Sequence, residues 1–374
     1  MIMLQNETIT ENQNGEGVIR PLIISDKETV SRYCPSFRHL LFGFEAQDVS
    51  CAMVVPPASE IEFFLFPRVK IVEHPLLRFP LFYMQNRRNL FERIEEIKPG
   101  IIHCFGTARA ILAKSIAEHF DIPAVISINS TYVRLSLRGV IRKSFEKIIV
   151  PSERIAQGLV KNFPKEKMTL VNVGTFADEA CSCFSSTERL PSMIVPGRFD
   201  KFGDYEPLLN AIRHLAVDGN EFVVVFMGHG KAEKQIREFI NQTGLVQTIA
   251  LTPLIRPLRS VFRGCDILIH TNCKGDFDPA VVEAAGAGLA IAADKNNVEE
   301  FLREGTTAIL FDGSDELSIY AALQKFLDDK AMAKSLAMNL QNHLRSNNSV
   351  SSMVNNLMKI YTATTKPSPV SKLP

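Results

Sequence analysis

The chain of 374 residues lacks an excess of either charge, because 42 lysine and arginine residues are balanced by 41 aspartate and glutamate residues. A surface without a large field of one sign gives no support to the binding of nucleic acid or of a strongly anionic membrane. We therefore expect no nucleic-acid partner, and we keep only peripheral contact with a membrane open.

A disulfide framework and a targeting segment are also missing. The seven cysteines are scattered, and those in apolar runs, such as 101–105, are typical of buried thiols in a reducing compartment. Cys181 and Cys183 form a close pair, but no matching His or Cys cluster follows at metal-ligand spacing. The N-terminus does not resemble a signal peptide, and no apolar run is long enough to span a bilayer. We expect a cytoplasmic protein without a metal site.

What the sequence does have is a repeated alternation of short apolar runs with amphipathic helical patterns. This alternation predicts parallel strands joined by crossover helices. The predicted strands of the first half are 21–25, 49–55, 61–66, 100–105, 124–128 and 147–150. Those of the second half are 192–196, 222–226, 248–251, 266–269, 289–292 and 308–311.

The length and the hydrophobic content of 46% are too large for one ordinary core. The alternation stops near 178–191 and then restarts, so we predict two doubly wound α/β domains, over 19–177 and 190–349. Residues 1–18 read as a disordered lead-in and 365–374 as a flexible tail.

Tandem doubly wound sheets predict a ligand site in the crevice outside the carboxyl ends of their strands. The small-residue segment from Glu283 to Gly288 is not a dinucleotide fingerprint, because its glycines close a helix instead of opening one. We therefore reject a nicotinamide cofactor.

Four segments of the second half occur in a characteristic order. They are the Gly-Arg stretch at 195–209, the Gly-His-Gly end of a strand at 225–230, the short helix with Asp266 at 258–271, and the small-residue helix at 272–294 with the downstream segment 298–311. This order resembles the group 1 glycosyltransferases, a retaining, nucleotide-sugar-using family with the two-Rossmann GT-B fold.

The resemblance implies a GT-B fold in which a last helix, 350–364, returns to the N-terminal domain. It also implies transfer of a sugar from a nucleoside diphosphate sugar to an acceptor hydroxyl with retention, and without a cofactor. The first half resembles the family more loosely. Where that family often carries a histidine after a strand, this sequence reads Ser127 to Asn129.

Departure of a nucleoside diphosphate requires stabilisation of its charge, which cationic side chains and helix N-termini can supply without a metal. The resemblance assigns this role to Arg198, directly after the first strand of the second domain. The family's lysine falls on Gly203, so Lys201 is the nearest substitute. The resemblance also places the backbone at Gly197, Gly228 and Gly230 beside the nucleotide.

Asp278 and Pro279 read as an N-cap and a first-turn proline of the small-residue helix. Asp278 thereby lies at the phosphate-facing end of that helix. The resemblance assigns Glu283 to the ribose hydroxyls. The alternative is an acidic residue favoured only by the helix dipole, worth at most about 1 kcal/mol.

The family's first motif glutamate falls on Gly275, and two family glycines fall on Asp276 and Asp278. Asp276 could replace the glutamate as a sugar contact, which is the preferred interpretation. The two aspartates could instead hold a divalent cation, or the site could have lost transfer. Two other functions therefore stay open, a catalytically silent GT-B binding module and a GT-B UDP-sugar epimerase. The sequence does not choose between a carbohydrate and a lipid-linked acceptor.

Overall fold

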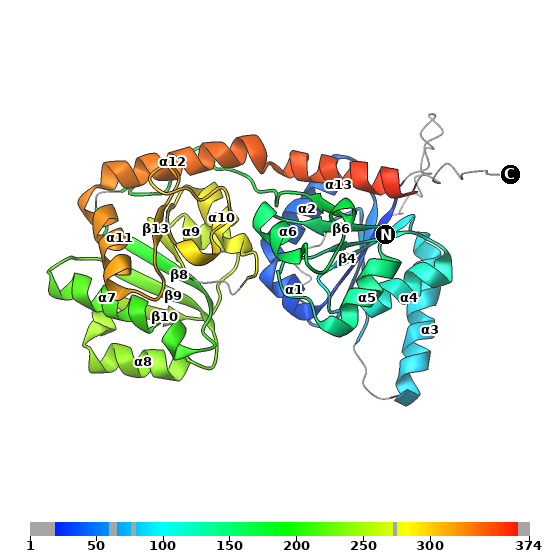
Figure 1. Cartoon of the computed structure of the whole chain (residues 1–374), viewed down its shortest axis with the longest axis horizontal. Coiled ribbons are helices and arrows are strands. Elements are labelled where there is room, and N and C mark those ends of the chain that lie inside the picture. The colour runs from blue at the N-terminus through cyan, green and yellow to red at the C-terminus, as the bar shows by residue number, and fades with distance from the viewer. Residues whose placement is uncertain (1–18, 60–65, 76–79, 187, 272–274, 366–374) are drawn as a thin grey trace, which may run out of the picture.

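The computed structural model describes residues 19–59, 66–75, 80–186, 188–271 and 275–365, which form two sheet-centred halves (Figure 1). The first sheet is parallel throughout, in the order β3-β2-β1-β4-β5-β6-β7. Its strands are β1 Pro21–Ser25, β2 Cys51–Val55, β3 Val69–Glu73, β4 Ile101–Phe105, β5 Ala124–Ser127, β6 Lys147–Val150 and β7 Met168–Leu170. The strand order reverses between β1 and β4, which is where such sheets open a crevice.

Helices cover both faces of this sheet, so that β1 and β2 are buried along their whole length. Burial on both faces explains why these strands read as continuous apolar runs. The helices are α1 Lys27–Arg32, α2 Cys34–Ala46, α3 Pro80–Ile97, α4 Ala110–Phe120, α5 Leu135–Ser144 and α6 Glu153–Leu159.

The second sheet is also parallel, in the order β10-β9-β8-β11-β12-β13. Its strands are β8 Ser192–Arg198, β9 Val223–His229, β10 Ile249–Thr252, β11 Ile267–His270, β12 Ala290–Asp294 and β13 Ile309–Phe311. Its helices are α7 Glu206–Val217, α8 Glu233–Gln242, α9 Leu258–Phe262, α10 Pro279–Ala287, α11 Glu316–Asp328 and α12 Lys330–Asn347. Two parallel sheets in tandem confirm the predicted α/β GT-B fold class.

Two strands were not predicted. β3 has a largely exposed, polar-alternating sequence, and β7 is a three-residue strand at the sheet edge, so neither produces an apolar run. The predicted strand at 61–66 lies outside the described residues except for Phe66, as do the predicted lead-in 1–18 and residues 366–374 of the predicted tail. The proposed boundaries at 177 and 190 fall within the connection from β7 to β8.

The last helix, α13 Val350–Thr365, continues from α12 and lies across the first half of the molecule (Figure 1). Its side chains Val354, Leu357 and Tyr361 are buried in the core of that half. α13 packs so closely on α2 that a Cβ atom added to Gly43 would lie 2.5 Å from Cγ2 of Val354. The predicted return of this helix is confirmed.

Among the described residues, none of the helices combines the length and the apolar character that crossing a bilayer requires.

The contact between α2 and α13 makes a first prediction. Gly43→Ala should lower the free energy of unfolding by about 1–3 kcal/mol, because the new methyl group forces apart two packed helices. The matched control is Gly139→Ala on α5, where an added Cβ meets no atom within 4 Å. That variant should be neutral or more stable by about 0.5–1 kcal/mol. Equal stability of the two variants in denaturant titrations would contradict the close packing.

Candidate functional site

The two halves of the molecule are joined by a short backbone pairing that we call the seam, residues 129–131 and 275–277. The amide of Thr131 donates to the carbonyl of Gly275 at 3.0 Å, and the amide of Phe277 donates to the carbonyl of Asn129 at 2.8 Å. The first segment follows β5 and the second precedes α10. The seam therefore places the carboxyl edge of the first sheet against the start of α10.

Side chains from the N-terminal half hold the seam from two sides. The hydroxyl of Tyr33 donates to the carbonyl of Phe277 at 2.8 Å, and Nη2 of Arg154 donates to the carbonyl of Asp276 at 2.9 Å. Arg154 also pairs with the buried carboxylate of Glu299 in the C-terminal half. Burial raises the pKa of Glu299, while the Arg154 guanidinium acts in the opposite direction.

Gly275 is required by the seam. Its φ of +86° lies in the left-handed region, and a Cβ atom there would be 2.3 Å from Oγ1 of Thr131. A glutamate at this position would adopt an unfavourable backbone conformation and its Cβ atom would clash with Thr131. The pairing of Gly275 with Thr131 thus gives a physical reason for the loss of the family's first motif glutamate.

The two aspartates beside Gly275 have different partners. Oδ2 of Asp276 lies 2.5 Å from Nη1 of Arg32 at the end of α1. Oδ1 of Asp278 accepts from the amide of Ala280 at 3.0 Å, which confirms the expected N-cap. Within the described ranges, no group of three or more His, Cys, Asp and Glu side chains is arranged to hold a metal ion. The sugar contact assigned to Asp276 stays a prediction, because its carboxylate contacts Arg32 in this structure.

Glu283 is buried in a polar cluster instead of facing an open cleft. Its side chain accepts from Oγ1 of Thr175 at 2.9 Å, lies 3.2 Å from Nη2 of Arg259, and lies 3.3 Å from Nδ1 of His39. The residue is only 4% exposed. Protein donors already occupy the carboxylate, so a ribose would have to displace at least one of them. The ribose assignment stays a prediction, and no pattern in the sequence indicates these three partners.

The predicted cationic pair lies at the end of β8. Arg198 is half exposed and forms an ion pair with Glu28 at the start of α1, across the two halves of the molecule, while its Nε lies 3.6 Å from Asp200. Lys201 is exposed three residues beyond the strand end. The structure thus gives Arg198 a carboxylate partner from the N-terminal half that sequence reasoning did not anticipate.

Two of the three predicted glycines, Gly228 and Gly230, are explained by backbone packing. Gly197 and Gly228 are register partners on β8 and β9, and a Cβ atom on Gly228 would lie 1.9 Å from the carbonyl oxygen of Gly197. A Cβ atom on Gly230 would lie 2.2 Å from the carbonyl oxygen of Phe199. Close approach of these two strand ends requires glycine at 228 and 230. Their predicted role beside a nucleotide is not tested by this packing.

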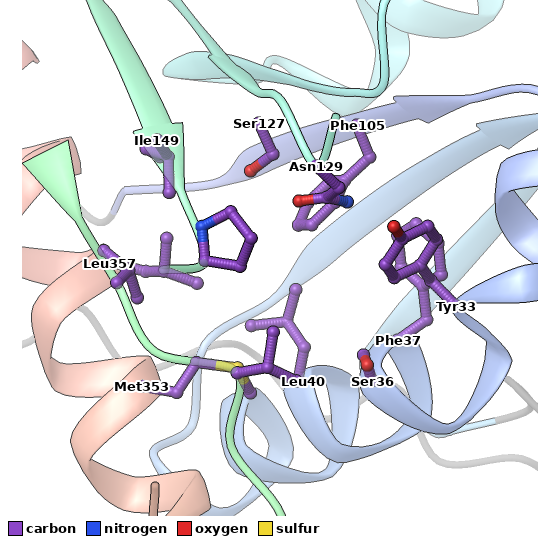
Figure 2. A pocket seen from close by; sticks show the side chains of 13 residues that line it. Tyr33, Ser36, Phe37, Leu40, Phe105, Ser127, Asn129, Ile149, Met353 and Leu357 are labelled. Atoms are coloured by element: carbon purple, nitrogen blue, oxygen red, sulfur yellow. The ribbon is translucent and has the colours of Figure 1, made fainter. Parts of the chain in front are cut away.

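A cavity of about 50 Å³ lies next to the seam, at the carboxyl ends of β4, β5 and β6 (Figure 2). Its walls come from α2 and α13 as well as from the strand ends, and most of the side chains are apolar. Ser36, Ser127, Asn129 and the Tyr33 ring supply the polar groups. Tyr33 and Asn129 also belong to the contacts of the seam, so the cavity and the start of α10 are neighbours.

A buried relay of hydrogen bonds leads from α13 to this cavity. Tyr361 Oη lies 2.6 Å from Nδ1 of His103, and Nε2 of His103 lies 2.7 Å from Oγ of Ser127. Burial lowers the pKa of His103 to about 3 and raises the pKa of Tyr361, so both groups are neutral near pH 7.

The direction in which hydrogen bonds are donated along the relay follows from the tautomer of His103. If the buried Tyr361 hydroxyl donates to Nδ1, the proton of the neutral imidazole is on Nε2 and is donated to Ser127. The hydroxyl hydrogen of Ser127 is then available to an acceptor atom in the cavity. We assign this tautomer because the reverse one would leave the buried Tyr361 proton without its His103 acceptor.

The family described as Glycosyl transferases group 1 matches residues 185–343, and the family described as Glycosyltransferase Family 4 matches residues 36–175. The chain belongs to the group 1 glycosyltransferases. The two matches meet in the connection between the sheets, so each half of this glycosyltransferase carries its own family signature. No curated protein matches its sequence.

Solved structures agree on the fold. A glycosyltransferase from Rickettsia africae superimposes with a TM-score of 0.77 at 13% identity, over 94% of this chain and 100% of that one. HepE from Anabaena, in complex with UDP and glucose, gives 0.76 at 11%, over 92% and 100%. Sucrose-phosphate synthase from Thermosynechococcus elongatus gives 0.73 at 15%, over 92% and 98%. At such low identity the likeness concerns the GT-B fold alone.

The relay predicts a pH-dependent stability. The pKa of His103 falls from 6.5 in the unfolded chain to about 3 in the fold, so the unfolded state binds more protons between these values. The stabilising contribution is complete above pH 6.5 and is lost as the pH falls toward 3. His103 alone should contribute a slope approaching about 1.4 kcal/mol per pH unit.

The measurement is the free energy of unfolding of the wild type and His103→Gln between about pH 5 and pH 7. The variant should show the smaller slope, and His229→Gln, at an exposed position at the end of β9, is the control. Identical slopes for wild type and His103→Gln would contradict the buried neutral imidazole.

Proposed function

We propose that this glycosyltransferase transfers a sugar from a nucleoside diphosphate sugar to an acceptor hydroxyl with retention at the anomeric carbon. The observation that carries the proposal is the position of Arg198. This residue ends the first strand of the half that matches the group 1 family, and it forms an ion pair with Glu28 of α1 in the N-terminal half. The complex of Anabaena HepE with UDP and glucose supports a donor of this class.

In the proposed reaction, the bond between the anomeric carbon and the diphosphate oxygen breaks while a bond to the acceptor oxygen forms on the same face. The acceptor proton passes to the departing diphosphate oxygen, so no protein base is required. Arg198, Lys201 and the N-terminus of α10 would stabilise the charge that develops on the diphosphate. The proposal includes neither a metal nor a cofactor.

The acceptor is expected on the N-terminal side of the seam. The cavity offers an apolar wall, the hydroxyl hydrogen of Ser127 and the side chain of Asn129 within one small space (Figure 2). We propose that an acceptor hydroxyl is oriented there, beside the start of α10. Carbohydrate and lipid-linked acceptors both present a hydroxyl of this kind.

The carboxylate of Glu28 contacts the Arg198 guanidinium, and we propose that the donor diphosphate binds this same guanidinium. The pair is 56% and 71% exposed at its two side chains, and exposed pairs of this kind are worth about 0.2–1 kcal/mol. Charge-assisted bonds to a diphosphate are worth about 1.5–3 kcal/mol each. A donor can therefore displace Glu28.

This comparison predicts opposite effects of two substitutions on UDP affinity. Arg198→Gln should weaken UDP binding by about 10- to 100-fold, because a charge-assisted fork is lost. Glu28→Gln should tighten it by up to about fivefold, because the competing carboxylate is neutralised. Lys201→Gln should have a smaller effect than Arg198→Gln. Calorimetric titration with UDP measures all three, and equal affinities of Arg198→Gln and wild type would contradict the diphosphate assignment.

The reaction itself is tested by incubating the purified protein with UDP-, GDP- and ADP-sugars and a panel of acceptors, and by assigning the product anomer by NMR. Retained configuration is the expected result, and an inverted product would refute retention. The observation favouring a silent module is that Gly275 has replaced a motif glutamate while Asp276 is bound to Arg32. Nucleotide binding without turnover for any donor would favour that alternative.

A further inference from the structure

Positive charge is concentrated in one stretch of this nearly neutral chain. Residues 130–170 contain nine lysines and arginines and only three acidic residues, whereas the whole chain has a net charge of +1. No acidic residue occurs between Asp121 and Glu146. The balance of the overall composition therefore conceals a local basic region.

Helix α5 lies at the centre of this region and exposes apolar as well as basic side chains. Leu135 is 79% exposed at its first position, and Tyr132, in the preceding turn, is 69% exposed. Arg142 and Lys143 are exposed on the same helix, while Ile141 is buried in the core. The helix is thus anchored by one face and presents a basic face with an apolar side chain to solvent.

The loop after α6 extends this face. Nη2 of Arg142 donates to the carbonyl of Asn162 at 2.7 Å, and Nζ of Lys167 donates to the carbonyl of Arg142 at 2.9 Å. These bonds place 161–167 against the end of α5. Exposed residues of the turn, the helix and the loop form what we call the basic surface, which consists of Tyr132, Arg134, Leu135, Arg142, Lys143, Lys161 and Lys165.

We propose that the basic surface docks this glycosyltransferase on an anionic lipid bilayer. Basic side chains within a Debye length of such a bilayer are attracted to its headgroups, and exposed aromatic and aliphatic side chains enter the interfacial layer. Leu135 and Tyr132 would be inserted, with Arg142 and Lys143 at the level of the headgroups. Three exposed acidic residues, Glu146, Glu153 and Glu166, occur in the same stretch, and its nine lysines and arginines outnumber them.

The position of the basic surface connects docking to the site. Tyr132 directly follows Thr131, whose amide donates to Gly275 in the seam. A bilayer at Tyr132 would therefore lie beside the start of α10, where an acceptor anchored in that bilayer could present its hydroxyl. This second statement, a lipid-linked acceptor, rests on the proposed function, whereas docking itself does not.

The exposed apolar residues favour a bilayer over a nucleic acid. A nucleic-acid surface of this charge would gain nothing from an aliphatic side chain that is 79% exposed, whereas an interfacial helix gains free energy by inserting it. The single exposed aromatic ring of Tyr132 is also too little for a base-stacking platform.

The test is co-sedimentation of the full chain, without nucleotide, with vesicles of pure phosphatidylcholine and of an equal mixture of phosphatidylcholine and phosphatidylglycerol. Binding to the mixed vesicles only is expected. Arg142→Gln and Lys143→Gln should each weaken it by on the order of fivefold, and Leu135→Ser should weaken it at every salt concentration.

Val217→Ser is the matched control for Leu135→Ser, because Val217 is 78% exposed but lies on α7 in the other half of the molecule. Equal binding to both vesicle types, or equal binding of Leu135→Ser and Val217→Ser, would overturn the proposal. So would binding of single-stranded DNA in place of vesicles.

Transfer assays separate this proposal from the proposed function. Vesicle binding in a protein that shows no turnover for any donor supports docking and removes the lipid-linked acceptor. Turnover with soluble acceptors in a protein that ignores anionic vesicles supports the transferase and overturns docking.

Discussion

The backbone pairing between residues 129–131 and 275–277 is the contact on which the rest of the site depends. Each sheet buries its own strands, but the position of α10 relative to the N-terminal half is fixed by these hydrogen bonds, by Tyr33 and Arg154, and by the contacts of Glu283 with His39 and Thr175. Gly275 has a positive φ of +86°, and a Cβ atom there would lie 2.3 Å from Oγ1 of Thr131, so the seam favours glycine at this position. The change that appears in the sequence as a lost motif glutamate therefore suits the contact between the two halves.

The ion pairs around the seam differ in strength, and this difference decides which of them a ligand can replace. Arg154 and Glu299 lie largely buried, and breaking such a pair by removing one partner costs about 3–5 kcal/mol. Arg198 with Glu28, and Arg32 with Asp276, are partly exposed and contribute little in water. Buried contacts therefore fix the halves of the molecule, while the two partly exposed pairs leave charged groups between the halves that can change partners.

The fold could be predicted from the sequence because strands buried on both faces, such as β1 and β12, leave continuous apolar runs, and because α13 carries apolar residues at helical spacing. The seam could not, since it joins segments about two-fifths of the chain apart, and Gly275 stands out in the sequence only as the replacement of a motif glutamate. Glu283 shows the same limit. Its spacing within the motif suggested a ribose contact, but Thr175, Arg259 and His39 come from three other parts of the chain. No local sequence pattern indicates that these three residues contact Glu283.

The cavity beside the seam depends on the C-terminal end of the chain in a way that the order of the two halves does not suggest. Tyr361 belongs to α13, yet its hydroxyl fixes the His103 tautomer and hence the direction in which Ser127 donates. Met353 and Leu357 of the same helix line the cavity (Figure 2). The N-terminal sheet therefore does not form this cavity by itself. A helix that follows the C-terminal half in the sequence completes the cavity, so the return of α13 shapes the cavity as well as covering the core.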